Sequence, residues 1–319
     1  MNDTNRKIPV VAVVGPTASG KSRLAVEIAL QTRGEIISAD SMQIYKGMNI
    51  GTAKPTEEEK RGVPHHLLDF ADLSCPFSVA DYVTLASACI TDLHTRGKLP
   101  ILAGGTGLYI RSLLENIQFT ETDRDDQLRE ELAKKAEAEG SESLVAELRA
   151  FDPQSAERIH PNNIGRLIRA IEIYCTTGLT MTEQVQRSRE KPSPYDSCLI
   201  GLDFQDRQML YDRINLRVDN MMKEGLLQEA KDVFSRPGSQ TALQAIGYKE
   251  LLPYFNGECS LENAVERIKQ ESRRYAKRQL TWFRRDTNLH WIIIDETKGF
   301  DSIAQEAMQI ISRKGWFNE

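Results

Sequence analysis

The sequence has few cysteines and no long apolar segment. It contains five cysteines among 319 residues, and no two of them form a C-x-x-C pair. An odd, widely spaced set of this kind is typical of reduced thiols in a cytosolic protein. The longest apolar run, residues 8–14, is far too short to cross a bilayer. We therefore expect a cytoplasmic protein with no signal peptide, no membrane span and no membrane partner.

The composition is that of a globular protein. The chain is 40% apolar and 27% charged, with 20 Gly and 12 Pro, which excludes wholesale disorder and collagen-like structure. Its length allows one large domain or two ordinary ones. Lys and Arg number 41 against 46 Asp and Glu, a net charge of −5. Spread evenly, that charge would argue against a nucleic-acid partner.

The amino-terminal part carries a repeated strand, turn and helix pattern. Residues 9–14 form a β-rich run without a polar face and end at a glycine, and a helical pattern follows from Lys21. Residues 99–105 repeat the strand and glycine turn, again before a helix, and residues 35–38 form a shorter strand. A strand without a polar face is typical of a parallel sheet covered on both sides. The pattern predicts an α/β fold.

The pattern changes near residue 117. Residues 121–149 carry ten acidic and five basic residues and no strand signal, so we expect helices there and again at 162–175 and 180–189. A Pro-Ser-Pro segment then precedes a new strand at 197–203, and a late strand is expected at 291–295. We predict a helical insertion at 117–196 within one core, which is formed by residues 1–116 and 197–319.

A phosphate-binding motif lies between the first strand and the first helix. Residues 15–22 fit G-x-x-x-x-G-K-[ST] and are Gly15, Pro16, Thr17, Ala18, Ser19, Gly20, Lys21 and Ser22. The glycines let backbone N–H groups converge on one phosphate, and the helix amino terminus adds partial positive charge. Lys21 adds a full charge, and Ser22 offers a hydroxyl for Mg²⁺. The motif predicts binding of a di- or triphosphate.

The second apolar strand lacks the carboxylate that P-loop kinases and NTPases use to organise Mg²⁺. Residues 99–103 run into Gly104 and Gly105, and we find no arginine-rich lid. The absence favours a diphosphate that departs as a leaving group over a nucleoside triphosphate that is hydrolysed. Asp40 follows the strand at 35–38 and is expected beside the phosphate loop. It could accept a proton or help to hold Mg²⁺, or it could cap a helix that begins at Ser41.

A basic segment near the carboxyl terminus offsets the acidic average. Residues 267–285 hold eight basic residues and one acidic one, with Tyr275, Trp282 and Phe283 between them. Taken alone, the segment is compatible with a solvated face of an amphipathic helix or with contacts to a phosphate backbone. His65 and His66 have no further metal ligand at a useful spacing, so we expect them to be structural. The chain ends without a Cys/His cluster, and no structural zinc is expected.

Several blocks resemble the tRNA dimethylallyltransferases (isopentenyl-diphosphate:tRNA transferases) of bacterial type. They lie at residues 15–22, 40–45, 47–55, 64–69, 104–109, 158–162, 244–250 and 276–282. The phosphate motif alone is shared with many unrelated enzymes, whereas the blocks together are specific. The resemblance implies transfer of a dimethylallyl group from dimethylallyl diphosphate to N6 of the adenosine 3′ of a tRNA anticodon, with Mg²⁺ as cofactor and a monomeric enzyme.

The resemblance also implies roles for individual residues. Lys21, Thr17 and Arg217 would contact the diphosphate, with Mg²⁺ on Ser22, and Asp40 would take the proton from N6. Whether Arg213, one helical turn before Arg217, contributes more than Arg217 to diphosphate binding is undecided from the sequence, and a solvated helix face would also explain both arginines.

The resemblance further implies a set of residues that hold the anticodon stem-loop. These are Asp40, Ser41, Met42, Gln43, Thr106, Arg129, Gly165, Arg166, Arg169, Gln244, Gly247, Lys249 and Arg278. Bases in a single-stranded loop are the accessible targets in RNA, because they can be pulled from their stack. For Thr106, a helix cap after the glycine turn is an alternative role. The sequence does not specify which tRNAs are modified or the order of substrate binding.

Three other functions remain compatible with the residues. An adenylate dimethylallyltransferase would prenylate free AMP, ADP or ATP on the same core. A P-loop kinase or NTPase would need a carboxylate-held Mg²⁺ near Ala103. A non-catalytic RNA-binding protein would use the glycine loop only as an anion site.

Overall fold

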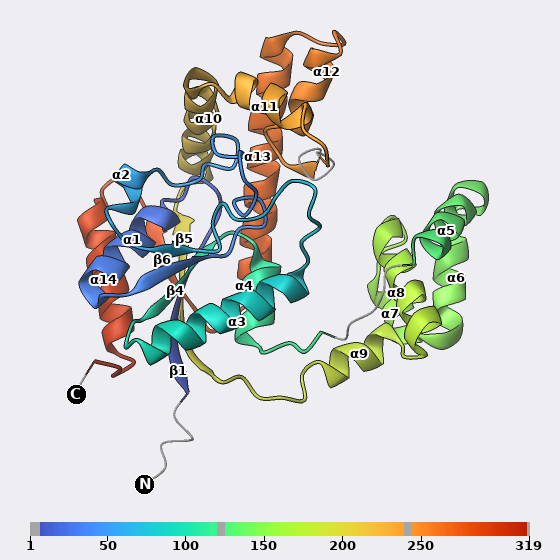
Figure 1. Ribbon diagram of the computed structural model, residues 1–319, viewed down its shortest axis with the longest axis horizontal. Coiled ribbons are helices and arrows are strands. Elements are labelled where there is room, and N and C mark those ends of the chain that lie inside the picture. Colours follow the sequence, from blue (N-terminus) through green and yellow to red (C-terminus); the bar gives the residue numbers. More distant parts are fainter. Residues whose placement is uncertain (1–6, 120–124, 239–243, 318–319) are drawn as a thin grey trace. The chain divides into compact units, whose positions relative to one another are not determined.

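The core of the protein is a six-stranded parallel sheet (Figure 1). The computed structural model describes residues 7–119, 125–238 and 244–317. The sheet order is β3-β2-β4-β1-β5-β6, with neighbouring strands parallel. The strands are β1 (Ile8–Val14), β2 (Glu35–Ser38), β3 (His65–His66), β4 (Pro100–Gly104), β5 (Tyr195–Phe204) and β6 (Leu289–Ile294). The predicted α/β class is confirmed, and the late strand β6 does join the sheet at an edge.

Helices cover both faces of the sheet. In β1, Val11 and Val13 pack toward α1 (Lys21–Thr32) and α14 (Phe300–Ser312). The alternating residues Val10, Ala12 and Val14 pack toward α3 (Val79–Thr95) and α4 (Gly107–Leu114). Successive strand side chains point to opposite faces, so a strand between two helical layers is apolar throughout. This explains the absence of a polar face in residues 9–14.

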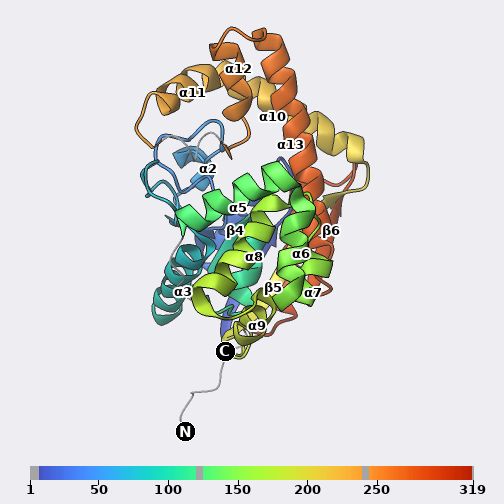
Figure 2. The ribbon, with the colours of Figure 1, turned by 90° about the vertical axis from the view of Figure 1, so that its right-hand side faces the viewer.

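The upper half of α13 in Figures 1 and 2 belongs to a group of helices outside the sheet layers. This group comprises α10 (Arg207–Glu224), α11 (Leu226–Phe234), a 3₁₀ turn (Lys249–Leu251), α12 (Leu252–Phe255) and α13 (Leu261–Phe283). Their apolar sides form a third cluster with Ile44, Tyr45 and Met48 from the segment that follows β2. This cluster fixes the loop after β2 against α10, α11 and α13. The short helix α2 (Glu57–Lys60) lies further along that segment.

Residues 115–193 form a second compact unit, separate from the unit of residues 1–114 and 194–319. Its described part is helical: α5 (Asp126–Glu139), α6 (Ser141–Phe151), α7 (Pro153–Arg158), α8 (Ile164–Thr177) and α9 (Met181–Arg187). Residues 121–124 of the stretch predicted as helical lie outside the described residues. The predicted limits of the insertion were 117 and 196. Strand β5 begins at Tyr195, two residues before the predicted start, because Tyr195 and Asp196 pair with Ile8 and Pro9 of β1.

The two histidines at the sheet edge take part in structural contacts. The Nε2 atom of His66 lies 2.7 Å from a carboxylate oxygen of Glu35, and Arg96 donates two hydrogen bonds to the same carboxylate at 2.6 and 3.0 Å. The hydrogen bonds from Arg96, helped by His66, lower the pKa of Glu35 to about 2. His65 contacts the carbonyl of Val63 through Nδ1.

The described ranges contain neither a cluster of metal ligands nor a helix that could span a membrane. No cluster of three or more His, Cys, Asp or Glu side chains there could hold a metal ion. None of the helices in these ranges combines the length and apolar content that crossing a bilayer requires.

Candidate active site

The phosphate loop connects β1 to α1 and contains two glycines in the left-handed region of backbone conformation. Gly15 and Gly20 have φ of +149° and +89°, which favour glycine. A Cβ on Gly15 would lie 2.9 Å from the carbonyl oxygen of Leu202. No side chain caps the start of α1, so its first N–H groups remain available to an anion. The hydroxyl of Ser19 is buried and has no hydrogen-bond partner in the described ranges. These features match the cradle that the motif predicts.

Two cations lie beside this loop. Arg217 of α10 donates to the hydroxyl of Thr17 at 3.5 Å, and Lys21 Nζ donates to the carbonyl of Pro16 at 3.3 Å. Burial and the neighbouring Arg217 charge lower the pKa of Lys21 to about 8, while Asp40 acts in the opposite direction. Burial also lowers the pKa of Arg217. Desolvated cations of like sign favour an anion between them, because the anion replaces lost hydration and relieves repulsion.

Arg213 lies apart from this pair. It is exposed, and its guanidinium carbon lies 5.5 Å from the ring centroid of Phe204. Arg217 is half-buried and reaches Thr17. The geometry therefore brings Arg217 to the phosphate loop and leaves Arg213 over an aromatic ring.

Asp40 follows β2 and organises a turn. One of its carboxylate oxygens, Oδ1, accepts hydrogen bonds from the N–H groups of Met42 at 2.9 Å and Gln43 at 3.3 Å. The chain forms turns after Ser41 and no helix, so the alternative of a helix cap is wrong in this detail. The turn fixes the carboxylate at the carboxyl edge of the sheet, where it also influences Lys21 and Arg217. A carboxylate held this way can accept a proton from a group bound above the edge.

Thr106 connects the loop after β4 to the loop after β2. Its hydroxyl accepts a hydrogen bond from the N–H of Ser41 at 3.2 Å, and its own N–H donates to the carbonyl of Ala39 at 3.2 Å. The carbonyl of Thr106 accepts from Tyr109 N–H at the start of α4. Thr106 therefore occupies the position of an N-cap residue of α4, but its side chain hydrogen-bonds to the loop that carries Asp40.

Close packing explains the glycines around Thr106. A Cβ on Gly104 would lie 2.1 Å from the carbonyl oxygen of Ala39. A Cβ on Gly105 would lie 2.0 Å from the amide nitrogen of Gln279, and one on Gly107 2.1 Å from the ring of Trp282. The end of β4 consequently has no room for the carboxylate that a kinase would place there.

Asp203 is a carboxylate at the end of β5 that our motif analysis missed. Its Oδ2 accepts from Arg284 at 2.6 Å, and its Oδ1 accepts from the N–H of Phe204 at 2.8 Å. Both oxygens are therefore engaged within the protein. This arrangement gives no support to a carboxylate-held metal of the kinase type.

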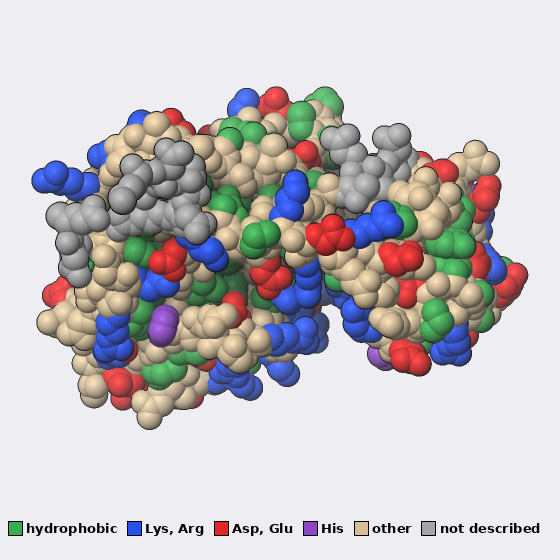
Figure 3. All heavy atoms as spheres, turned by 90° about the horizontal axis from the view of Figure 1, so that it is seen from below, with side chains coloured by type: hydrophobic (Ala, Val, Ile, Leu, Met, Phe, Trp, Pro, Cys, Tyr) green, Lys and Arg blue, Asp and Glu red, His purple; other side chains and the backbone are tan. Residues whose placement is uncertain are grey.

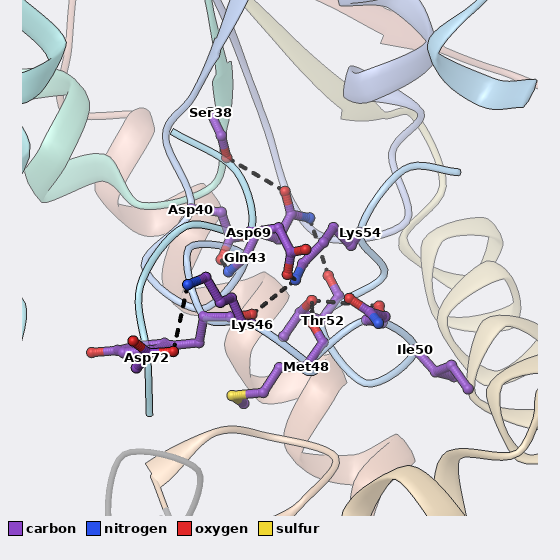
Figure 4. Close-up of polar contacts among 12 residues, drawn as sticks. Ser38, Asp40, Gln43, Lys46, Met48, Ile50, Thr52, Lys54, Asp69 and Asp72 are labelled. Carbon is purple, nitrogen blue, oxygen red and sulfur yellow. Dashed lines mark hydrogen bonds and ion pairs between the residues drawn. The ribbon is translucent and has the colours of Figure 1, made fainter. Parts of the chain in front are cut away.

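The segment after Asp40 is folded by its own side chains (Figure 4). Gln43 donates from its amide to the carbonyls of Thr52 and Ala53 at 3.1 and 3.2 Å, and its amide oxygen accepts from Ser38 at 3.4 Å. Lys54 donates to the carbonyl of Tyr45 at 2.8 Å and also forms an ion pair with Asp69. The side chain of Gln43, which the resemblance assigns to the RNA side, is thus used to shape this loop.

Glu229 of α11 anchors the same segment, and nothing in the local sequence indicated it. Its carboxylate accepts hydrogen bonds from the N–H groups of Asn49, Ile50 and Gly51, each at 2.9 Å. It also accepts from the hydroxyl of Tyr248 at 2.7 Å. Two of its partners, Gly51 and Tyr248, lie in blocks that carry the family resemblance, but Glu229 itself lies in none of them.

Among the residues of this unit that are expected to contact RNA, Arg278 and Gln244 are the exposed ones. Arg278 is exposed and lies over the ring of Tyr275, 5.7 Å from its centroid. With Arg267 and Arg274 it forms a stripe at spacings of seven and four, which one helix face carries. The face in Figure 3 shows groups of basic side chains besides scattered acidic ones, so a net charge of −5 leaves room for local positive surface.

The segment 244–249 is also partly exposed. Gln244 is exposed and Lys249 half-buried, with Lys249 Nζ 3.7 Å from a carboxylate oxygen of Glu250. Gly247 has φ of +98° and donates its N–H to Glu250 at 2.8 Å. Glycine is required at 247 by the backbone turn, whatever partner the segment has.

In the helical unit, Arg129 and Arg169 share one carboxylate partner, Glu172, which the sequence did not indicate. Arg129 donates two hydrogen bonds to Glu172 at 2.7 and 2.8 Å, and Arg169 donates one at 2.6 Å. Burial alone would raise the pKa of Glu172, but the arginines outweigh it and lower that pKa to about 2. Arg166 and Gly165 are exposed. The structure thus separates Arg166 at the surface from Arg129 and Arg169, which a buried carboxylate orients.

Comparison with known proteins places the chain in a family. The model of the family described as IPP transferase matches residues 43–286. A curated relative from Bacillus subtilis (strain 168), named tRNA dimethylallyltransferase, is 52% identical over 288 residues, which cover 90% of this chain and 91% of the relative.

Two solved structures agree with this relationship. Full-length tRNA isopentenylpyrophosphate transferase from Bacillus halodurans matches with a TM-score of 0.73 and 46% identity, covering 97% of each chain. A eukaryotic dimethylallyltransferase acting on tRNA matches with a TM-score of 0.83 and 29% identity, covering 98% of this chain and 80% of the other. The chain therefore belongs to the IPP transferase family, the family of the tRNA dimethylallyltransferases.

Proposed function

We propose that this enzyme transfers the dimethylallyl group of dimethylallyl diphosphate to N6 of the adenosine 3′ of the anticodon in tRNA. Membership of the family supports the transferase activity, and its curated members carry that activity in their name. One observation carries the residue-level mechanism. Two desolvated cations, Lys21 at the start of α1 and Arg217 of α10, lie beside the phosphate loop and the uncapped start of α1, and the charge of Asp40 acts on both.

The chemistry needs a leaving group and a proton acceptor. The bond between the allylic carbon and the diphosphate oxygen breaks, and the diphosphate leaves with the electron pair. The N6 lone pair forms the new carbon–nitrogen bond, and N6 then loses a proton. Adenosine N6 is a poor nucleophile because its lone pair is delocalised into the ring. Stabilisation of the departing diphosphate must therefore supply most of the rate acceleration.

The phosphate loop performs the first task. Its N–H groups and the amino terminus of α1 face the charge that develops on the diphosphate, and Lys21 and Arg217 add two full charges. The hydroxyl of Thr17, which accepts from Arg217, orients that arginine toward the loop. These groups bind intact dimethylallyl diphosphate, and they bind the departing diphosphate more strongly because it carries more negative charge.

The oxygen atoms near the phosphate loop are also suitable ligands for Mg²⁺. Ser22 presents an exposed hydroxyl in the first turn of α1, and the carboxylate of Asp40 is near enough to act on Lys21. Hydroxyl, carboxylate and phosphate oxygens are the hard ligands that Mg²⁺ prefers. We infer that Ser22 holds the ion, which when bound neutralises charge on the diphosphate.

Asp40 performs the second task. One of its oxygens holds the turn at Met42 and Gln43, and the carboxylate accepts the proton of N6 as the new bond forms. Thr106 fixes the loop of Asp40 and lies on the RNA side. The anticodon stem-loop is held by Ser41, Met42, Gln43, the segment 244–249 and Arg278, and by Arg129, Gly165, Arg166 and Arg169 of the helical unit. We infer that the enzyme acts in the cytoplasm as a monomer.

A side-by-side assay tests this function. Radiolabelled dimethylallyl diphosphate is offered to AMP and to unmodified tRNA under the same conditions, and the tRNA is digested for mass analysis of its nucleosides. We expect label in tRNA, as an adenosine carrying the five-carbon group. Label in AMP alone would favour an adenylate dimethylallyltransferase. Turnover of a nucleoside triphosphate without any prenyl transfer would favour a kinase or NTPase.

A further inference from the structure

Gln279 connects the two sides of the proposed active site. It lies on α13 with 5% of its surface exposed. Its amide oxygen accepts a hydrogen bond from the N–H of Thr17 in the phosphate loop at 2.9 Å. Its amide nitrogen donates to the carbonyl of Gly105, next to Thr106, at 3.1 Å. A single side chain thus joins the loop of the donor to the loop of the acceptor base.

The contacts demand a glutamine. The bridge needs one acceptor and one donor at the end of a side chain of fixed length, and both partners are backbone groups. A glutamate would keep the acceptor, lose the donor and bring a negative charge toward the diphosphate. An asparagine is one methylene shorter. Gly105 has no side chain, which leaves room for the amide nitrogen at this position.

Neighbours on the same face of α13 extend the bridge. The hydroxyl of Tyr275, one turn earlier, lies near enough to the side chains of Thr106 and Gln279 for both to act on its pKa. Burial and the nearby charge of Asp40 raise the pKa of Tyr275, so this hydroxyl stays protonated. Trp282 packs against Gly107 at the start of α4. One face of α13 therefore fixes the position of the loop that holds Thr106.

We propose that Gln279 is a positioning residue that sets the separation between the bound diphosphate and the adenosine N6. The inference rests on the proposed function and adds a residue to it. Gln279 touches neither reacting atom, so its removal should change the rate of transfer more than the affinity for either substrate. Displacement of reacting groups by about 1 Å can cost on the order of 100-fold in rate.

The main test compares Gln279→Met with wild type. Methionine has a similar volume and makes neither hydrogen bond. We measure the single-turnover rate with saturating tRNA and donor, and the dissociation constants of inorganic pyrophosphate and of unmodified tRNA separately. The rate is expected to fall about 30- to 100-fold. Each dissociation constant is expected to stay within about threefold of wild type, because the phosphate loop cations and the RNA contacts remain.

Two further variants sharpen the result. Gln279→Asn keeps both polar groups on a shorter side chain and is expected to retain more activity than Gln279→Met. Gln270→Met, an exposed glutamine of the same helix, serves as the matched control and should match wild type. Hydrogen exchange of the phosphate-loop peptide should quicken in Gln279→Met without any substrate, since Thr17 N–H loses its acceptor.

The outcomes separate this inference from the proposed function. A normal rate in Gln279→Met, or a loss of rate fully explained by weaker pyrophosphate or tRNA binding, overturns the positioning role. Unchanged exchange of the phosphate-loop peptide also overturns it, and this readout needs no activity. Wild-type enzyme that modifies no tRNA would instead refute the proposed function, on which the positioning role depends.

Discussion

The depressed pKa of Lys21 makes donor use sensitive to pH. Burial and the charge of Arg217 lower this pKa from an ordinary value of 10.5 to about 8 in the free enzyme. Only the protonated amine attracts a diphosphate. With a pKa of about 8, the protonated fraction of Lys21 at pH 9 is about one tenth, whereas an unperturbed lysine would remain almost fully charged. The value of kcat/KM for dimethylallyl diphosphate should therefore fall about tenfold between pH 7 and pH 9.

The assay uses donor far below its KM and saturating tRNA, so that the pH profile reports groups of the free enzyme. The Lys21→Arg variant provides the control, because an arginine stays charged throughout this range. Its activity is expected to be lower than wild type at pH 7, since the side chain is larger, but to lack the alkaline fall. A wild-type profile that stays flat to pH 10, or an identical fall in both enzymes, would refute the reasoning.

Three other substitutions have defined outcomes. Glu172→Ala leaves Arg129 and Arg169 without their shared buried partner. It should destabilise the helical unit by about 1–3 kcal/mol in calorimetry, because the two arginines, 30% and 35% exposed, can still be solvated, and an unchanged unfolding transition would contradict this. Glu229→Ala removes the acceptor of three backbone N–H groups and should speed hydrogen exchange in residues 49–51. Unchanged exchange would show that Glu229 does not hold this segment in place. Arg278→Ala should weaken tRNA binding and reduce its salt dependence by about one counterion, with donor binding unaltered; an unaltered salt slope would exclude a phosphate contact.

The sheet and its helices could be predicted because their signals are local. The apolar run at 9–14, the glycine turn and the helix starting at Lys21 are each visible within a few residues, and the structure confirms them as β1 and α1. The strand at 35–38 is found with the same limits. The start of β5 was placed two residues late, because its first residues are defined only by pairing with β1.

The partners of the site residues could not be predicted, because they depend on contacts distant in sequence. Glu172 lies 43 residues from Arg129, and Gln279 lies 262 residues from Thr17. Glu229 is one of many acidic residues on helices, and only the fold shows three N–H groups pointing at it. The helix cap considered for Asp40 failed for a related reason: the side chain closes a turn, and the chain after it packs on another loop.

The role of Asp40 is the central claim, and one measurement tests it most directly. Asp40→Asn keeps the size of the side chain and an oxygen that can accept from Met42 and Gln43, but it removes the proton acceptor. With saturating donor and tRNA, its single-turnover rate should fall by about 100-fold or more while both substrates still bind. A variant that transfers the dimethylallyl group at the wild-type rate would contradict the account.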